Sequence, residues 1–195
     1  NRASNGGGGM FLNGDDTASS NFEIEECWFR ENVSLGPTGG GGLVATAPGL
    51  AVEVDRTTFS GNRATDGGGN GGALLMNRAS LHIERSTFSA NEAAAYGGAI
   101  LVSATNASAL LALRDVTVTA NRANSDSDAV GGGGGVAAFI DSGQTATLEL
   151  ANTILAGNLD PSAAPSPDAF LLAGSLLTLT SSGFNLIGSN EGAET

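Results

Sequence analysis

The chain contains no lysine, so its eight basic residues are all arginine, and they stand against 20 acidic residues. The formal net charge is therefore −12. Nucleic-acid binding requires a basic face, and anionic membranes attract basic segments, so the composition argues against both partners. An acidic surface of this kind suits an environment that is rich in salt or divalent cations.

Cysteine and long apolar runs are also scarce. Cys27 is the only cysteine, which excludes an internal disulfide. No stretch of 18 apolar residues occurs, so the sequence predicts no membrane insertion, and no signal peptide is recognisable. The chain opens inside a repeat and neither end resembles a solenoid cap, so we expect a segment of a longer protein, or other molecules stacked on its ends.

A repeat of about 30 residues runs through the chain. Its clearest copies are Thr58-Phe59-Ser60-Gly61-Asn62 and Thr87-Phe88-Ser89-Ala90-Asn91. The asparagine recurs with spacings of 31, 30, 29, 30, 37 and 32 residues, at Asn1, Asn32, Asn62, Asn91, Asn121, Asn158 and Asn190. Self-similarity at a fixed period of this length indicates stacked structural repeats.

Apolar residues alternate with polar ones ahead of each repeated motif. The alternating pairs are Phe22/Ile24, Val52/Val54, Leu81/Ile83, Leu111/Leu113 and Leu148/Leu150. A period of two predicts strands with one buried face, and no 3.6-residue period is sustained, which excludes helical repeats. The pattern predicts an all-β fold, a right-handed parallel β-helix of about six coils. We expect one domain over residues 1–195, with loop excursions near residues 122–133 and 159–168.

Equivalent residues of successive coils should stack in columns. One column is expected to fill the interior, and it contains Phe29, Phe59, Phe88, Val118 and Leu155. A second column has a structural role, because asparagine tolerates the left-handed backbone of a turn and its amides can bond to one another along the rod; it contains Asn32, Asn62, Asn91, Asn121 and Asn158. The Gly-Gly pairs predict turns or a close approach of two backbone segments.

The combination of Gly-Gly-[Ala/Ile/Val/Leu] with Phe-x-x-Asn resembles the paired motifs of polymorphic outer-membrane-protein passengers. The tail, with Asn152-Thr153-Ile154-Leu155-Ala156-Gly157-Asn158, then Pro167-Asp168, then Gly183-Phe184-Asn185-Leu186-Ile187-Gly188, is similar to the end of anchor-bearing β-helix domains in large secreted bacterial proteins. The resemblance implies a β-helix in an extracellular or cell-surface location. It implies no catalytic residues, because these families are defined by scaffold positions; we expect no cofactor, with calcium as the one possible ligand.

Carboxylates recur on the outward side of the alternating strands. Glu23, Glu53, His82 and Glu149 should form one column, and Glu25, Asp55, Glu84 and Arg114 the next. Stacked carboxylates could bind calcium, which makes Glu23, Glu25, Glu53, Asp55 and Glu84 candidate ligands, or could supply the acid pair of a glycosidase. The alternative is a solvated strand face that Arg56, Arg85 and Arg114 partly neutralise.

The strand after each Gly-Gly pair is apolar on both faces. A solenoid buries only one face in its core, so the other predicts a protein interface or a surface covered by a loop of the same chain. We assign to the interface the residues Met10, Leu12, Leu75, Leu101, Val136 and Ala138.

Two further surface patterns have other interpretations. Thr58/Ser60, Thr87/Ser89 and Thr117/Thr119 form an outward array, which suits β-structure or ice binding. A polysaccharide-active enzyme would need an acid and a base together, but His82 and Tyr96 should face different sides of a coil.

The sequence therefore predicts a non-catalytic extracellular structural or assembly module that packs against other protein, or against copies of itself, through its apolar sheet or open ends. The alternatives are a surface adhesin that binds glycans through Trp28, Tyr96 and the loops, and a polysaccharide lyase or hydrolase that uses Glu84.

Overall fold

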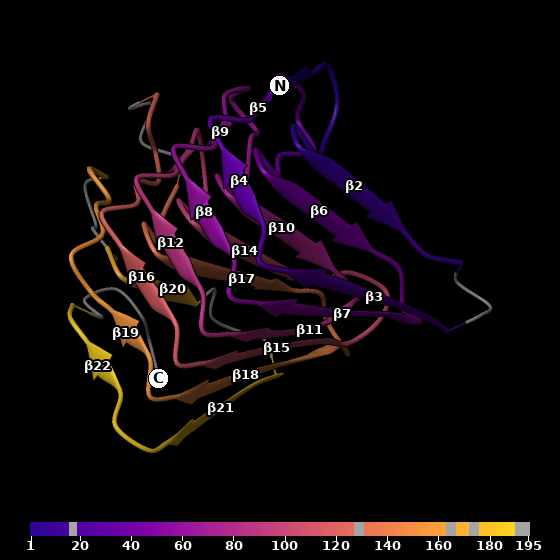
Figure 1. Ribbon diagram of the computed structural model, residues 1–195, viewed down its shortest axis with the longest axis vertical. Coiled ribbons are helices and arrows are strands. Elements are labelled where there is room, and N and C mark those ends of the chain that lie inside the picture. Colours follow the sequence, from indigo (N-terminus) through magenta and orange to yellow (C-terminus); the bar gives the residue numbers. More distant parts are fainter. Residues whose placement is uncertain (16–18, 127–130, 163–166, 172–175, 190–195) are drawn as a thin grey trace.

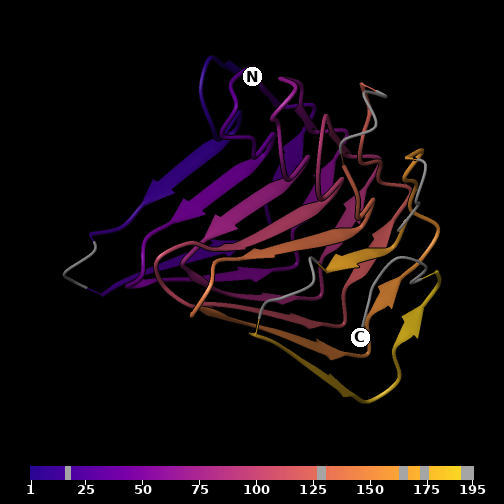
Figure 2. The same ribbon diagram turned by 180° about the vertical axis from the view of Figure 1, so that it is seen from behind.

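The computed structural model describes residues 1–15, 19–126, 131–162, 167–171 and 176–189. This part of the chain is all-β, contains no helix, and winds into a parallel β-solenoid of about six turns (Figure 1). Figure 2 shows the same stack from behind, with the strands of successive turns side by side along the rod. The predicted β-helix is therefore confirmed.

Three sheets of six parallel strands run along the rod, and each turn adds one strand to each sheet. We name the first the Gly-Gly sheet, and its strands are β2 (Met10–Asn13), β6 (Leu43–Thr46), β10 (Leu74–Asn77), β14 (Ile100–Ala104), β17 (Val136–Ile140) and β20 (Ala169–Leu171). The second is the acidic sheet, which contains β3 (Ser20–Glu25), β7 (Leu50–Asp55), β11 (Ser80–Glu84), β15 (Ala109–Arg114), β18 (Thr145–Ala151) and β21 (Leu176–Ser182).

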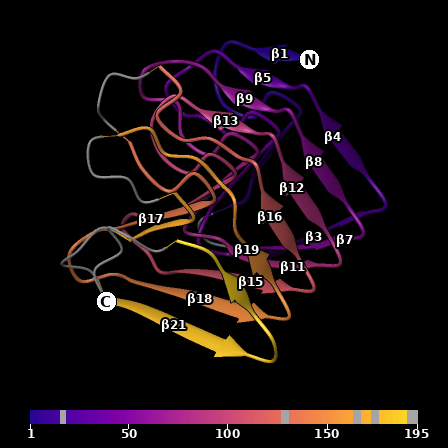
Figure 3. The ribbon, with the colours of Figure 1, turned by 90° about the vertical axis from the view of Figure 1, so that its left-hand side faces the viewer.

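The third sheet, which we name the hydroxyl sheet, is built from shorter strands. They are β4 (Trp28–Arg30), β8 (Thr58–Ser60), β12 (Thr87–Ser89), β16 (Thr117–Thr119), β19 (Ile154–Leu155) and β22 (Leu186–Ile187). A fourth sheet has two-residue strands, β1 (Arg2–Ala3), β5 (Val33–Ser34), β9 (Arg63–Ala64) and β13 (Glu92–Ala93). Figure 3 shows this fourth sheet, the hydroxyl sheet and the acidic sheet on different sides of the coil.

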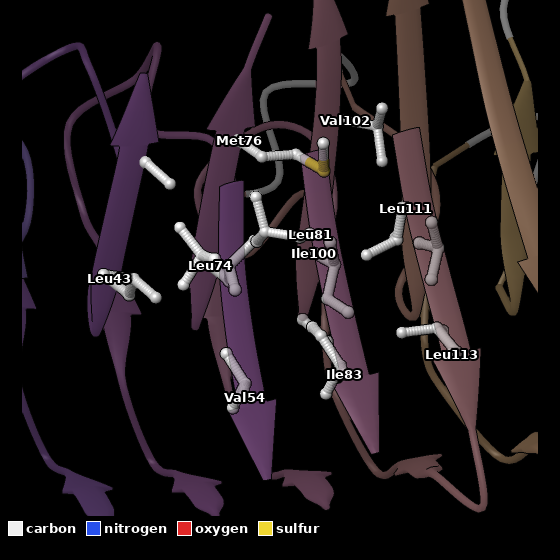
Figure 4. Close-up of a cluster of buried hydrophobic side chains, with 14 of the residues drawn as sticks. Leu43, Val54, Leu74, Met76, Leu81, Ile83, Ile100, Val102, Leu111 and Leu113 are labelled. Atoms are coloured by element: carbon white, nitrogen blue, oxygen red, sulfur yellow. The ribbon is translucent and has the colours of Figure 1, made fainter. Parts of the chain in front are cut away.

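The core lies between the sheets and includes the predicted column of Phe29, Phe59, Phe88, Val118 and Leu155. Figure 4 shows Leu43, Leu74 and Ile100 of the Gly-Gly sheet among side chains of the acidic sheet, in one continuous apolar cluster. Phe29, Phe59 and Phe88 stack with ring centroids 4.7 and 4.6 Å apart and with nearly parallel planes. Burying such side chains is worth roughly 1.5–3 kcal/mol each, so the columns are a main source of stability.

The asparagine column forms a ladder of buried hydrogen bonds. Each amide Nδ2 donates to Oδ1 of the asparagine one turn further along: Asn32 to Asn62 at 2.9 Å, Asn62 to Asn91 at 2.9 Å, Asn91 to Asn121 at 2.8 Å and Asn121 to Asn158 at 2.9 Å. The same oxygens also accept the backbone N–H groups of the preceding asparagines. The structural role predicted for this column is thus confirmed, while Asn190 lies outside the described residues.

The left-handed backbone of this turn lies one residue earlier than expected. The residues with positive φ are those that precede the ladder asparagines, with φ values of 51°, 62°, 54°, 55° and 73° at Glu31, Gly61, Ala90, Ala120 and Gly157. The expectation that asparagine itself adopts this conformation is therefore wrong. Because the chain reverses before the asparagine, the amide that follows can enter the interior, where it is buried.

The two glycines of a Gly-Gly pair have different roles, as Gly97 and Gly98 illustrate. Gly97 has φ of +66°, in the left-handed region that favours glycine. At Gly98 a Cβ atom would lie 2.3 Å from the carbonyl oxygen of Gly134 and 2.4 Å from the carbonyl carbon of Arg122. The first glycine makes the turn, and the second allows neighbouring backbones to approach.

The register of the Gly-Gly sheet differs from the prediction by one residue in two turns. Leu74 and Ile100 align with Leu43, where alignment on the Gly-Gly pairs predicts Ala73 and Ala99. Backbone bonds along the sheet show the reason: Gly42 N–H donates to Ala73 O, Ala73 N–H to Ala99 O, and Ala99 N–H to Gly135 O. In those two turns alanine stands where the others have the last glycine. Aligning the sequences on their Gly-Gly pairs therefore shifts β10 and β14 by one residue.

The two predicted loop excursions lie between turns. In the first, Tyr96 forms a parallel bridge with Gly132, and Arg122 bridges Glu92 and Leu159. In the second, Pro167 and Asp168 stand where earlier turns have glycines, since Gly135 N–H donates to Pro167 O. Residues 127–130 and 163–166 of these loops lie outside the described part of the chain.

Candidate functional site

The outer face of the acidic sheet carries the two predicted columns of charged residues. The strand register places Glu23 beside Glu53, Glu53 beside His82, and Ala112 beside Glu149. It also aligns Glu25, Asp55, Glu84 and Arg114. This face is hollowed by a depression of about 290 Å³, lined by Glu23, Ile24, Glu25, Glu53, Val54, Asp55, His82, Glu84 and Arg85.

Arginines at the adjoining corner bind the second column. The guanidinium of Arg56 pairs with Glu25, with Asp55 and, at 3.1 Å, with Glu26. Arg85 Nη2 lies 2.8 Å from Asp55 Oδ1, and Arg85 Nη1 lies 3.0 Å from Glu84 Oε2. Carboxylates and guanidinium groups therefore alternate along the rod in a network of ion pairs.

The network shifts the pKa of three groups. The hydrogen bond from Arg85 and the positive charge of Arg56 hold the pKa of the Asp55 carboxyl below its ordinary value, although desolvation opposes the shift. The hydrogen bond to Glu26 raises the pKa of Arg56, and the bond to Asp55 raises that of Arg85. A depressed carboxyl pKa stabilises the fold at neutral pH, and that stabilisation is lost as the pH falls through the folded-state value.

An Arg85→Gln variant is expected to raise the pKa of the Asp55 carboxyl toward its ordinary value, because the strongest hydrogen bond to that carboxylate is removed. The pH dependence of the Asp55 side-chain carboxyl carbon resonance measures the shift. Arg114→Gln is the matched control, since Arg114 pairs with Glu84 at 3.3 Å. Equal titration of Asp55 in the two variants would contradict the assignment.

A calcium site on this face is not favoured. Within the described residues, no group of three or more His, Cys, Asp or Glu side chains is arranged to hold a metal ion. Of the five candidate ligands, Glu25, Asp55 and Glu84 are occupied by arginine, while Glu23 and Glu53 belong to the neighbouring column. The geometry agrees better with the alternative, a charged face that arginines partly neutralise.

The predicted apolar interface is divided between two faces of the Gly-Gly sheet. Val136 and Ala138 lie in the core, and Leu12 packs against it. Met10 is paired with Leu43 and is the first residue of the inward column to which Leu43 belongs. Their assignment to an outer interface is therefore wrong, and the mistaken register is the reason.

Leu75 and Leu101 do face outward, but their own chain buries them. With Val44 and Ala137 they form a second apolar cluster, against which Tyr96, Phe139 and Phe170 pack. The Tyr96 and Phe139 rings meet edge to face, with centroids 4.5 Å apart. The face is therefore buried within its own chain, by Tyr96 and by side chains of strands β17 and β20 rather than by the loop that the sequence left open as the alternative to an interface, and Tyr96 itself is half-buried.

His82 and Tyr96 lie on different sides of the rod, as predicted. His82 is exposed on the acidic sheet, where its Nε2 lies 3.4 Å from Ser80 Oγ. Tyr96 belongs to the second apolar cluster outside the Gly-Gly sheet. The histidine and the tyrosine therefore do not contribute to one site.

Uncovered apolar side chains gather instead at the first and last turns. Phe22 is 43% exposed, whereas Val52, the next residue of its column, is 0% exposed. Of the eleven large apolar side chains that are exposed in the described residues, eight lie in these two turns, namely Met10, Phe11, Phe22 and Trp28 in the first and Leu179, Phe184, Leu186 and Ile187 in the last; the other three are Leu35, Ile154 and Leu159.

Sequence reasoning missed two polar features at the corners. Thr57 and Ser86 form a shorter hydroxyl ladder, in which each hydroxyl oxygen accepts the backbone N–H of the residue one turn earlier, Cys27 or Thr57. Asp168 ends the asparagine ladder, because its Oδ1 accepts the Asn158 amide at 2.8 Å. Both features leave a signal in the sequence. Thr57 and Ser86 stand at equivalent positions of successive repeats, and Asp168 replaces a glycine of the Gly-Gly pair.

Comparisons with protein-family models, with curated proteins and with solved structures each returned no match. Among the described residues, no helix has the length and apolar character needed to cross a membrane.

Proposed function

We propose that this chain is a non-catalytic structural segment of an extracellular or cell-surface protein. It is a rigid β-helical rod that packs against further protein through the inward columns that its outermost turns leave uncovered, at Phe22 in the first turn and at Leu179 and Ile187 in the last. The observation that carries the proposal is the contrast within one column, in which Phe22 is 43% exposed and Val52 is fully buried. One more turn of β-helix on that edge would bury the same surface.

The two ends of the rod are suited to each other. In the described residues, β2, β3 and β4 are the outermost strands of their sheets at one end, and β20, β21 and β22 at the other. Because all pairing is parallel and the sheets keep their order, a second copy could add strands head to tail. Unpaired strand edges are natural templates for such addition, and a head-to-tail contact that does not close builds a filament.

The charged surface supports selective rather than general association. The net charge of −12 makes the flanks of two rods repel each other, so contact is favoured only where apolar ends meet. An acidic surface without lysine, together with the resemblance of the repeats to secreted β-helix proteins, supports the extracellular location.

The test is the molar mass in solution, measured by light scattering over a range of concentrations. We expect species larger than the 19.2 kDa monomer, and we expect Phe22→Glu to suppress them because it places a charge on the uncovered apolar edge. Asn21→Glu is the matched control, since Asn21 is exposed on the same strand and lies outside the apolar column. A monomer at every concentration would contradict association through these ends.

The same measurement in EDTA separates this proposal from assembly through calcium. We expect no change in molar mass, because arginines occupy the carboxylates of the second acidic column. Loss of the larger species in EDTA would instead assign a metal to the acidic sheet.

A further inference from the structure

The outer face of the three middle strands of the hydroxyl sheet, β8, β12 and β16, is a regular, uncharged strip. Thr58, Thr87 and Thr117 align in one outward column and Ser60, Ser89 and Thr119 in the other, while Phe59, Phe88 and Val118 between them are buried. Strands β8, β12 and β16 carry no charged residue, in contrast to the acidic sheet beside them. We name these six residues the hydroxyl strip.

The first strand of the sheet departs from this pattern at both outward positions. Trp28 stands where the next turns have threonine, and Arg30 where they have serine. Strands β8, β12 and β16 show that a small hydroxyl residue suffices here, whereas β19 and β22 place Ile154 and Leu186 in the same column. A tryptophan that is 66% exposed therefore has no packing role that would explain it.

The indole is held in a fixed orientation at the end of the strip. Its Nε1 donates to Ser60 Oγ of the next turn at 3.1 Å, and the guanidinium carbon of Arg30 lies 5.4 Å from the ring centroid. Arg30 is oriented in turn by Glu31, whose carboxylate lies 3.0 Å from Arg30 Nε. Bonds of this kind pre-organise an aromatic side chain for contact with a ligand, because less rotamer freedom remains to be lost.

We propose that Trp28 and the hydroxyl strip bind an uncharged, extended polysaccharide. The apolar C–H face of a sugar ring can stack on the exposed indole, and serine and threonine hydroxyls can both donate to and accept from sugar hydroxyls. Neighbouring strands are ~4.8 Å apart, so the hydroxyl pairs repeat at a distance close to the length of one sugar unit. An acidic chain is disfavoured by the net charge of −12.

This inference does not depend on association of the rod through its ends. The hydroxyl strip is on the side of the solenoid, and one molecule contains all of it (Figure 3). Failure of self-association would therefore leave the polysaccharide site intact, and failure of polysaccharide binding would leave the structural role intact.

The experiment uses cellohexaose and chitohexaose as uncharged probes and polygalacturonate as the acidic comparison. The chain has a single tryptophan, so its fluorescence reports on Trp28 alone. We expect a saturable change in emission with at least one uncharged probe and none with polygalacturonate. No saturable change with either hexasaccharide would overturn the proposal.

Variants measured by titration calorimetry locate the site. Trp28→Ala is expected to weaken binding by about tenfold, and Thr87→Val, which removes one hydroxyl at similar volume, by roughly threefold. Phe184→Ala is the control, since Phe184 is an exposed aromatic residue outside the hydroxyl strip. Thermal unfolding checks that each variant is folded.

Three outcomes would overturn the assignment. Binding that Trp28→Ala leaves unchanged would place the site elsewhere. Tighter binding to polygalacturonate than to the uncharged probes would exclude the proposed ligand class. Inhibition of ice-crystal growth without any saccharide binding would assign the hydroxyl strip to ice.

Discussion

An Asn91→Ala variant is expected to unfold with a free energy at least about 3 kcal/mol lower than that of the parent chain. Asn91 Oδ1 accepts the backbone N–H and the side-chain amide of Asn62, both at 2.9 Å. Its Nδ2 donates to Phe59 O at 3.0 Å. Alanine would remove all three bonds from a buried site, where the Asn62 amide would keep only its bond to Phe29 O, and each buried polar group that loses a partner costs about 1–3 kcal/mol. Equilibrium unfolding in guanidinium chloride measures the difference.

Asn21→Ala is the control for this variant. It removes the same side chain from an exposed position on β3, where water replaces any lost contact. A change within about 0.5 kcal/mol is expected there. If Asn91→Ala were equally mild, the ladder would contribute no more than a solvated amide.

A Gly98→Ala variant is expected to lose at least about 3 kcal/mol, or to fail to fold at 25 °C. The new methyl group would lie 2.3 Å from Gly134 O and 2.4 Å from the carbonyl carbon of Arg122. Both are backbone atoms of the next turn, since Arg122 forms a bridge with Glu92. The overlap can therefore be relieved only if the two turns move apart. Parallel strands along the whole Gly-Gly sheet would have to adjust.

Gly67→Ala supplies the comparison at a glycine that has room. Its nearest atom to a new Cβ is Asp126 Oδ2 at 3.9 Å, and its backbone is not left-handed. Unchanged or slightly increased stability is expected, because alanine restricts the unfolded chain. Thermal and denaturant unfolding of both variants would show whether close approach, rather than the loss of glycine itself, determines the effect.

The columns with a clear period of two were predictable from sequence. Polar Glu53 between apolar Val52 and Val54 leaves no doubt about which face is inside, and the Thr-Phe-Ser motif sets the third sheet in the same way. The amide ladder followed from the recurrence of asparagine alone. In each case one residue type repeats at one spacing and only one face suits the interior.

The Gly-Gly sheet could not be aligned by the same reasoning. Strands such as Leu74-Leu75-Met76 are apolar at every position, so they give no alternation, and a register shift of one residue exchanges the inner and outer faces. The glycine run also varies between turns, with alanine as its last member at Ala73 and Ala99. The second apolar cluster could not be predicted either, because the residues that pack on it, Tyr96, Phe139 and Phe170, come from three different turns.

The bonds between amides give the rod a direction. Each ladder asparagine donates through Nδ2 to the asparagine on its C-terminal side and accepts through Oδ1 from the one on its N-terminal side. All of these hydrogen bonds therefore point in the same direction along the rod. Asp168 ends this sequence: Oδ1 accepts from Asn158, and Oδ2 accepts the backbone N–H of Ser189 at 2.6 Å. An ionised carboxylate has no hydrogen to donate. The ladder therefore cannot continue beyond Asp168. The last turn is instead joined at another corner of the coil, where Thr153 N–H donates to Asn185 Oδ1. The two ends of the rod are therefore chemically unequal, and a molecule that adds beyond Asp168 must do so through the strand edges rather than through the amides.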